Sequence, residues 1–214
     1  MKRRPSLCLI ALAISPASIV AATLSFEGSF THDDDIQQIV FMMASPGDVT
    51  LRTWSFAGGT NVLGHTIPAG GFAPILALFD AAGNFMTEDS SASISDCGPR
   101  AADPVSTFCW DAYLHLGLSA GSYIVALTQD DNFPNGPTLS DGFKRAGEGD
   151  FTGPNFLGAP GAFILVDGSQ RSAFWAVDLV IVNDATQVPE PAGFQAVGLC
   201  ALLLLALRRR LVRN

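Results

Sequence analysis

Residues 122–129 (SYIVALTQ) decide the fold that this sequence predicts. Tyr123, Val125 and Leu127 stand at every second position, and this period of two places them on one face of a β-strand. The Ala120-Gly121 pair just before them is typical of a turn. The stretch therefore predicts a strand whose apolar face lies against a core.

Segments with the same period recur on both sides of this strand, separated by turn sequences. The expected strands are residues 23–30, 36–44, 49–56, 74–80, 85–86, 110–118, 122–129, 162–166 and 173–182. Between the two ends of the chain, no window of twelve or more residues has a helical period. Short strands with frequent turns favour two packed sheets, so the predicted fold class is all-β, an antiparallel β-sandwich.

Two long segments lack a strand period. Residues 58–71 are rich in glycine and predict a loop. A phosphate-binding loop would need a helix start and usually a lysine after it, and neither follows here. Residues 130–161 also lack a periodic segment, and a stretch of this length favours a functional loop.

The start of the chain has the composition of a secretory signal. The basic residues of Met1-Lys2-Arg3-Arg4 precede a mainly apolar segment, residues 7–20, and the small residues Val20-Ala21-Ala22. This order predicts a signal helix within residues 1–22, cleavage before Thr23, and export of the remaining chain.

The other end of the chain combines three features in a fixed order. Pro189, Glu190 and Pro191 come first, then the uncharged run 192–207, and then a basic group that includes Arg208, Arg209 and Arg210. As a helix the run would span roughly 24 Å, a little less than the ~30 Å core of a bilayer. We expect a single transmembrane helix at 192–207 with its arginines on the cytoplasmic side.

This terminal segment resembles the PEP-CTERM sorting signal of Gram-negative bacteria that make exopolysaccharide. The resemblance implies recognition of the Pro189-Glu190-Pro191 motif by an exosortase, which is a membrane-embedded cysteine protease. It also implies transfer of the upstream domain from the inner membrane to the cell surface or the extracellular matrix. A plain membrane anchor and a hydrophobic core helix are the alternatives.

The middle of the chain carries a second resemblance. The stretches VTLRTWSFAGGTN (49–61), ALFDAAGN (77–84) and LSAGSYIVALTQDDN (118–132) are similar to exported bacterial domains found ahead of such tails, in particular the prepeptidase C-terminal domain. That family implies a jelly-roll-like sandwich that serves as an accessory module. The expected domains are thus the signal peptide 1–22, the sandwich 23–187 and the sorting segment 188–214.

The sandwich segment is strongly acidic. Residues 23–187 hold five basic residues against nineteen acidic ones, a formal charge of −14, whereas the whole chain has −8 because the other basic residues lie near its ends. Such a charge repels phosphates, so we expect no nucleic-acid partner. It attracts divalent cations.

Two cysteines lie within the sandwich segment, Cys97 and Cys109. In an oxidising compartment they are expected to form a disulfide, which would stabilise the fold by roughly 3 kcal/mol; two free thiols are the alternative.

Six aspartates are candidates for binding Ca²⁺. They are Asp33, Asp34, Asp35, Asp130, Asp131 and Asp141. Calcium takes six to eight oxygen ligands from flexible loops, and clustered carboxylates at strand ends supply them. The alternative is a solvated acidic surface with ordinary turn residues, and no EF-hand spacing is present. Similarity to calcium-stiffened sandwich domains keeps the calcium site as an expectation, and no other cofactor is expected.

The catalytic motifs H-E-x-x-H and C-x-x-C are missing from the sequence. The one match to G-x-S-x-G, Gly117 to Gly121, spans an expected turn between two strands, whereas a nucleophile elbow requires a strand-to-helix turn. We therefore expect a non-catalytic protein of the cell envelope or of an exopolysaccharide matrix. A calcium-dependent carbohydrate-binding module and a secreted hydrolase are the alternatives. Trp54, Trp110 and Trp175 could form a sugar-stacking platform, but each falls in an expected strand, which favours core packing.

Overall fold

The computed structural model describes residues 20–90, 97–103 and 107–183, which belong to one compact unit. The sorting motif Pro189-Glu190-Pro191, the expected span 192–207, the arginines 208–210 and the signal segment before Val20 lie outside the described residues. Among the residues that are described, no helix is both long and apolar enough to cross a membrane.

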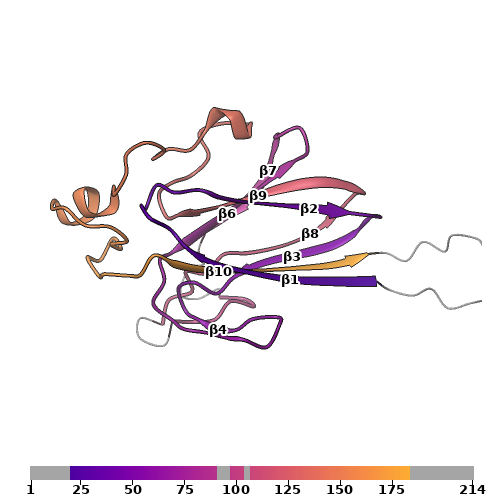
Figure 1. Cartoon of the computed structure of the whole chain (residues 1–214), viewed down its shortest axis with the longest axis horizontal. Coiled ribbons are helices and arrows are strands. Elements are labelled where there is room, and N and C mark those ends of the chain that lie inside the picture. Colours follow the sequence, from indigo (N-terminus) through magenta and orange to yellow (C-terminus); the bar gives the residue numbers. More distant parts are fainter. Residues whose placement is uncertain (1–19, 91–96, 104–106, 184–214) are drawn as a thin grey trace, which may run out of the picture. The chain divides into compact units, whose positions relative to one another are not determined.

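The described residues form two four-stranded sheets (Figure 1). The first has the order β1-β10-β3-β8, with β1 at Val20–Ser29, β10 at Phe174–Asn183, β3 at Gly47–Thr53 and β8 at Tyr113–Leu118. The second has the order β2-β9-β6-β7, with β2 at Gln37–Met43, β9 at Gly121–Gln129, β6 at Pro74–Asp80 and β7 at Phe85–Asp89. A small hairpin pairs β4 (Gly59–Thr60) with β5 (Thr66–Ile67). Every pair of strands is antiparallel, which confirms the predicted all-β, antiparallel class.

The core lies between the two sheets and takes alternating side chains from strands of both sheets. On β9 the alternating residues Tyr123, Val125 and Leu127 are buried as expected. On β10, facing them from the other sheet, Val177 and Leu179 are fully buried in the same cluster. Burying each such side chain stabilises the fold by roughly 1.5–3 kcal/mol, so the period of two is the main determinant of the sandwich.

Strand β6 is buried on both faces. Leu76 and Leu78 point into the central core, whereas Ala77 and Phe79 belong to a second cluster with Phe143, which comes from the long segment after β9. A continuous apolar sequence instead of an alternating one is what such a strand requires. The segment 130–146 thus covers the outer face of this sheet.

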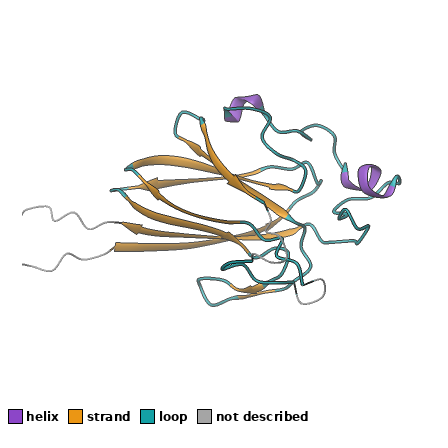
Figure 2. Ribbon diagram, turned by 180° about the vertical axis from the view of Figure 1, so that it is seen from behind, coloured by secondary structure: helices purple, strands orange, loops and turns teal. Residues whose placement is uncertain are grey.

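Most of the long loops gather at one end of the sandwich, together with two short helical turns (Figure 2). These turns are η1 (Leu139–Asp141) and η2 (Gly153–Leu157), both within the segment that joins β9 to β10. We call this part of the molecule, with residues 97–103 and 107–112, the loop end.

Two of the predicted strands and one predicted loop were wrong in detail. Residues 162–166 form only an isolated bridge between Ile164 and Gln170, because Phe163 has a φ of 54° and leaves the extended conformation. The expected strand 110–118 begins only at Tyr113, so Trp110 lies in the preceding loop. The glycine-rich segment 58–71 contains the β4–β5 hairpin.

Candidate functional site

A pocket of about 250 Å³ lies at the loop end, beside the last residue of β9. Its lining comes from four parts of the chain: the residue Phe56 after β3, the cysteine loop, the end of β9, and the long segment before β10. No local sequence pattern indicates a shared site, because these parts are far apart along the chain.

Aromatic side chains form one wall of the pocket. These are Phe56, Phe108, Trp110 and Phe156. The Trp110 ring is tilted against both Phe56 and Phe108, with ring centroids 6.1 and 5.7 Å away. Trp110 is only partly buried, so part of its ring borders the pocket. The wall thus presents apolar and π-electron surface to whatever enters.

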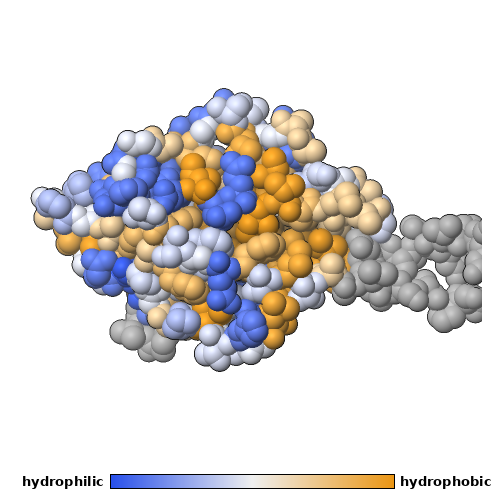
Figure 3. Space-filling model, viewed as in Figure 1, coloured by the Kyte–Doolittle hydropathy of each residue, from blue (hydrophilic) through white to orange (hydrophobic). Residues whose placement is uncertain are grey.

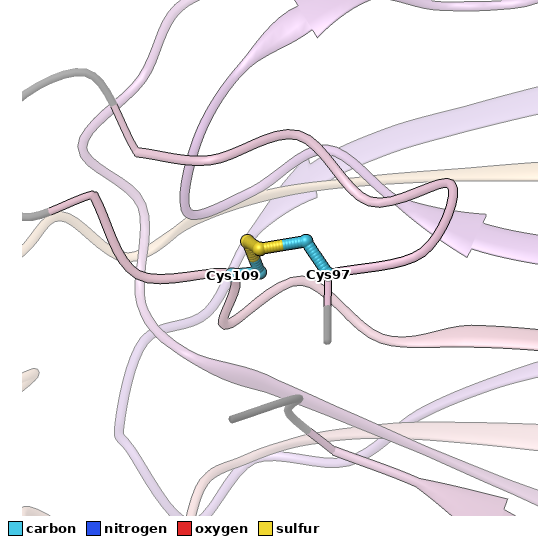
Figure 4. Close-up of a disulfide and its surroundings, with 2 residues drawn as sticks. All are labelled: Cys97 and Cys109. Carbon is cyan, nitrogen blue, oxygen red and sulfur yellow. A yellow bond between two sulfur atoms is a disulfide. The ribbon is translucent and has the colours of Figure 1, made fainter. Parts of the chain in front are cut away.

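A disulfide holds this aromatic wall in place (Figure 4). Cys97 and Cys109 are bonded, with their Cα atoms 5.5 Å apart, which confirms the predicted pairing. Cys109 is fully buried and stands between the two pocket residues Phe108 and Trp110. The backbone N–H of Asp103 also donates to the carbonyl of Phe108 at 2.8 Å. Both the disulfide and this bond restrict the loop that carries the wall.

Gln129 supplies the unusual polar group of the pocket. It is the last residue of β9 and is fully buried, yet it lines the pocket. Within the described part of the chain, neither its Nε2 nor its Oε1 has a hydrogen-bond partner. Leaving a buried polar group unpaired costs about 1–3 kcal/mol, so an amide with two unpaired atoms beside a pocket indicates a ligand position.

The charged groups of the pocket are mainly acidic. Asp103, Asp130 and Asp167 line it together with Arg171. Burial raises the pKa of the Asp130 carboxyl. The hydrogen bond from Ser169 lowers the pKa of Asp167, which is therefore ionised at neutral pH.

Arg171 is already engaged by the protein itself. Its guanidinium lies 3.7 Å from the centre of the Phe56 ring, and its nitrogens donate to the carbonyls of Gly71 at 2.9 Å and Phe56 at 2.8 Å. The same group lies 3.7 Å from the buried carboxylate of Asp103. The positive charge of Arg171 is thus neutralised by partners within the protein, and it does not make the pocket cationic.

Asp111 fixes the backbone next to this wall. It is 1% exposed and accepts three hydrogen bonds, from Thr53 Oγ1 at 2.8 Å, from the N–H of Phe56 at 3.1 Å and from the N–H of Ala57 at 2.8 Å. Burial raises the pKa of its carboxyl. Sequence reasoning missed both Asp111 and Gln129, because a single polar residue at a strand end has no periodic signature.

The six predicted calcium ligands fall into three groups along the chain: residues 33–35, residues 130–131 and Asp141. The structure brings the first two groups together. The side-chain amide of Asn132 donates to the carbonyl of Asp34 at 3.2 Å, which joins residues 33–35 to residues 130–132. Their carboxylates, however, accept bonds from the protein. Asp33 is fully buried and accepts from Thr152 Oγ1, from the Thr152 N–H at 2.9 Å and from the Phe163 N–H at 3.1 Å.

The other predicted ligands also have protein partners. Asp34 accepts from the N–H of Gly147 at 2.8 Å, and Asp35 accepts from the N–H groups of Thr31 at 2.6 Å and His32 at 3.0 Å. Asp131 pairs with Lys144 at 2.5 Å and with Arg145.

Asp141 lies elsewhere, at η1, where its carboxylate accepts from Thr138 N at 2.8 Å. This turn contacts the β6–β7 connection through the Leu139 N–H, which donates to the carbonyl of Gly83 at 2.7 Å. In the described residues, no group of three or more His, Cys, Asp or Glu side chains is arranged to hold a metal ion. The calcium assignment therefore stays a prediction.

The three tryptophans occupy different environments. Trp175 is in the core, as expected. Trp54 donates from Nε1 to Asp178 at 2.5 Å and lies under the Arg52 guanidinium, 3.7 Å from its ring centre. Trp110 lines the pocket. They do not form a common platform.

Comparison with known proteins finds a likeness among solved structures and none among family models or curated sequences. No model of a known family matches the chain, and no curated protein sequence matches it. Among solved structures, the pre-peptidase C-terminal domain of collagenase from Bacillus anthracis is similar over 74% of this chain and 88% of its own, with a TM-score of 0.34 and 9% identity.

Proposed function

We propose that this chain is an exported, non-catalytic β-sandwich module that is sorted to the cell envelope or to an exopolysaccharide matrix. The observation that carries this proposal is the order of the Pro189-Glu190-Pro191 motif, the apolar run 192–207 and Arg208 to Arg210, placed after a signal-like start and an acidic all-β domain. In this proposal the tail is a transient transmembrane helix and the substrate of an exosortase. The domain upstream is the jelly-roll-like cargo.

The geometry of that motif supports proteolytic processing. Proline fixes its own φ and disfavours the helical conformation for the residue before it, so the sequence of the motif favours an extended chain. Proteases bind extended chains. A short extended motif ahead of a membrane span is therefore well presented to a membrane protease.

The test is the double substitution Pro189→Ala and Pro191→Ala in a host that has an exosortase. We expect an unprocessed chain held in the inner membrane, detected by fractionation and by mass spectrometry of the C-terminus. The matched control is Pro160→Ala, which changes an exposed proline of the long loop and should leave processing normal. Unchanged processing of the double variant would refute the role of the motif.

A carbohydrate-binding function is the second candidate, and the pocket favours it. An aromatic wall beside unpaired polar atoms is the usual composition of a small-ligand site. Calcium dependence is a separate part of this candidate. Thermal melting with millimolar calcium and with EDTA tests it: a higher midpoint with calcium is expected, and an unchanged midpoint would remove the metal from the proposal.

A further inference from the structure

The amide of Gln129 restricts the chemistry of a ligand in the pocket. A primary amide presents one acceptor, Oε1, and one donor nitrogen, Nε2, side by side in a plane. Both atoms are without a partner in the described part of the chain and have almost no solvent-accessible surface, so a ligand reaches them only when the side chain turns into the pocket that it lines. A matching ligand therefore offers a donor and an acceptor on adjacent atoms. Neighbouring hydroxyl groups on a ring satisfy this requirement, because a hydroxyl both donates and accepts.

The aromatic wall adds a second requirement. Trp110 and Phe108 offer apolar ring surface, and both line the same pocket as Gln129. A ligand that fits has an apolar face as well as a hydroxylated edge. A pyranose ring has both: its C–H groups gather on its faces and its hydroxyls project from its edge. The pocket volume of about 250 Å³ lies below the roughly 300–1,000 Å³ typical of drug-sized ligands, which suits a single ring.

Charge selects among sugars. Asp130 and Asp167 face the pocket, while the cation of Arg171 is taken up by Asp103, by two carbonyls and by the Phe56 ring. The sandwich segment as a whole has a formal charge of −14. A uronic acid or a phosphorylated sugar would be repelled by this field. A neutral sugar meets no such penalty.

An organic cation is the strongest competing ligand, because aromatic rings and carboxylates together bind ammonium groups. Two observations favour the sugar. The Phe56 ring already has a guanidinium 3.7 Å from its centre, so a second cation there would be repelled. A quaternary ammonium ligand would also leave both atoms of the Gln129 amide unpaired, and a primary ammonium group would leave Nε2 without an acceptor.

We infer that the pocket binds one pyranose residue of a neutral polysaccharide, with the Gln129 side chain turned into the pocket, two neighbouring hydroxyls on its amide and one C–H face against Trp110. This inference rests on the carbohydrate-binding candidate above and is independent of sorting. The module would then attach to uncharged glycan and not to an acidic polymer.

The sharpest variant is Gln129→Met, which keeps the length of the side chain and removes both amide atoms. Because these atoms have no partner among the described residues, the variant should melt at the same temperature as the parent chain or higher. Gln38→Met is the matched control, since Gln38 is exposed on β2. Trp110→Ala removes the aromatic face, and Trp54→Ala controls for it because Trp54 is a partly buried tryptophan outside the pocket lining.

Binding is measured on the full chain in detergent, by calorimetry and by saturation-transfer NMR. The probes are the methyl glycosides of glucose, galactose and mannose, with glucuronic acid and tetramethylammonium as comparisons. We expect millimolar binding of at least one neutral glycoside, weakened about tenfold or more by Gln129→Met and by Trp110→Ala and unchanged in the two controls. Saturation should be strongest on the C–H protons of one ring face.

Each contrary result overturns a defined part of the inference. Neutral-sugar binding that survives both pocket substitutions overturns the pocket assignment and leaves the carbohydrate candidate standing. Tighter binding of glucuronic acid or of tetramethylammonium overturns the class of ligand. If none of the glycosides binds, both the inference and the carbohydrate-binding candidate are overturned. Processing at Pro189-Glu190-Pro191 is measured separately, and none of these results affects it.

Discussion

The body of the sandwich and its loop end are stabilised by different kinds of interaction. In the body, alternating side chains such as Val125 and Leu179 bury apolar surface between two sheets. At the loop end, buried carboxylates collect hydrogen bonds from irregular backbone: Asp33 and Asp111 each accept three. Irregular backbone has N–H groups without sheet partners, and a buried carboxylate satisfies several of them at once. The loop end thus depends on a few polar residues, and the body on many apolar ones.

The largest effect is expected from Asp111→Ala. The change leaves the N–H groups of Phe56 and Ala57 and the hydroxyl of Thr53 without their acceptor inside the protein. Each unpaired buried donor costs about 1–3 kcal/mol, so the free energy of unfolding should fall by about 4 kcal/mol or more. Urea denaturation measures it. Asp48→Ala, on the exposed face of β3, should stay within about 0.5 kcal/mol.

A smaller loss is expected from Leu179→Ala in the body. Leu179 is fully buried in the central cluster, and removing its side chain should cost about 3 kcal/mol. Val182→Ala changes an outward residue of the same strand, 39% exposed, and should cost less than about 1 kcal/mol. Both variants should unfold in one transition. Two separate transitions would show that the body and the loop end unfold independently, as two domains do.

Removing the disulfide tests how the loop end is held. The bond joins cysteines separated by 12 positions, and on the chain-entropy model such a loop contributes somewhat under 3 kcal/mol. Cys97→Ser with Cys109→Ser should lower the free energy of unfolding by about that amount. A reducing agent should destabilise the parent chain equally and leave the double variant unchanged. Equal stability of parent and variant would contradict a structural role for the bond.

The same contrast explains how much the sequence predicted. The strands were predictable because a period of two is visible in SYIVALTQ and in the segment around Leu179. The disulfide was predictable because only two cysteines, Cys97 and Cys109, lie in the sandwich segment 23–187. The loop end was not predictable, because Asp33 and its partner Thr152 are 119 positions apart and nothing local marks either.

The pocket escaped prediction for a related reason. Gln129 is one polar residue at the end of an apolar strand, a position that usually faces solvent at a turn. Trp110 was expected in a strand and therefore in the core. A strand that begins three positions later, at Tyr113, leaves it in the wall of the pocket. Boundaries of strands are the least certain part of a sequence prediction, and here the boundary separates a core residue from a site residue.

Two individual carboxylates, Asp33 and Asp80, should contribute to the pH dependence of stability with opposite signs. Burial raises the pKa of Asp33 above its ordinary value of 3.8, although bonds from Thr152 and Phe163 lower it. Between 3.8 and the raised pKa the folded chain holds more protons than the unfolded one, so this group lowers stability as pH rises through that window. Asp80, in the β6–β7 turn, has a pKa lowered by Asn84. Its contribution is present above pH 3.8 and is lost as pH falls through the lowered pKa.

Asp33→Asn and Asp80→Asn separate these contributions. Neither asparagine titrates, so Asp33→Asn should flatten the decline of stability above pH 3.8, and Asp80→Asn should flatten the rise below it. Urea unfolding in buffers from about pH 3 to 7 measures both slopes. Parallel profiles of the two variants would contradict the opposite pKa shifts of Asp33 and Asp80.

The smallest effect is expected for the exposed ion pair of the loop end. Lys144 is 49% exposed and shares Asp131 with Arg145, which lies 5.2 Å from the Phe151 ring and also contacts Glu148. Lys144→Ala should cost only about 0.5 kcal/mol, since exposed pairs are screened and Asp131 keeps its second partner. Arg145→Ala should cost more, and the cost of Lys144→Ala should shrink further at high salt. A Lys144 effect as large as that of Asp111 would mean that the surface charges, and not the buried carboxylates, hold the loop end.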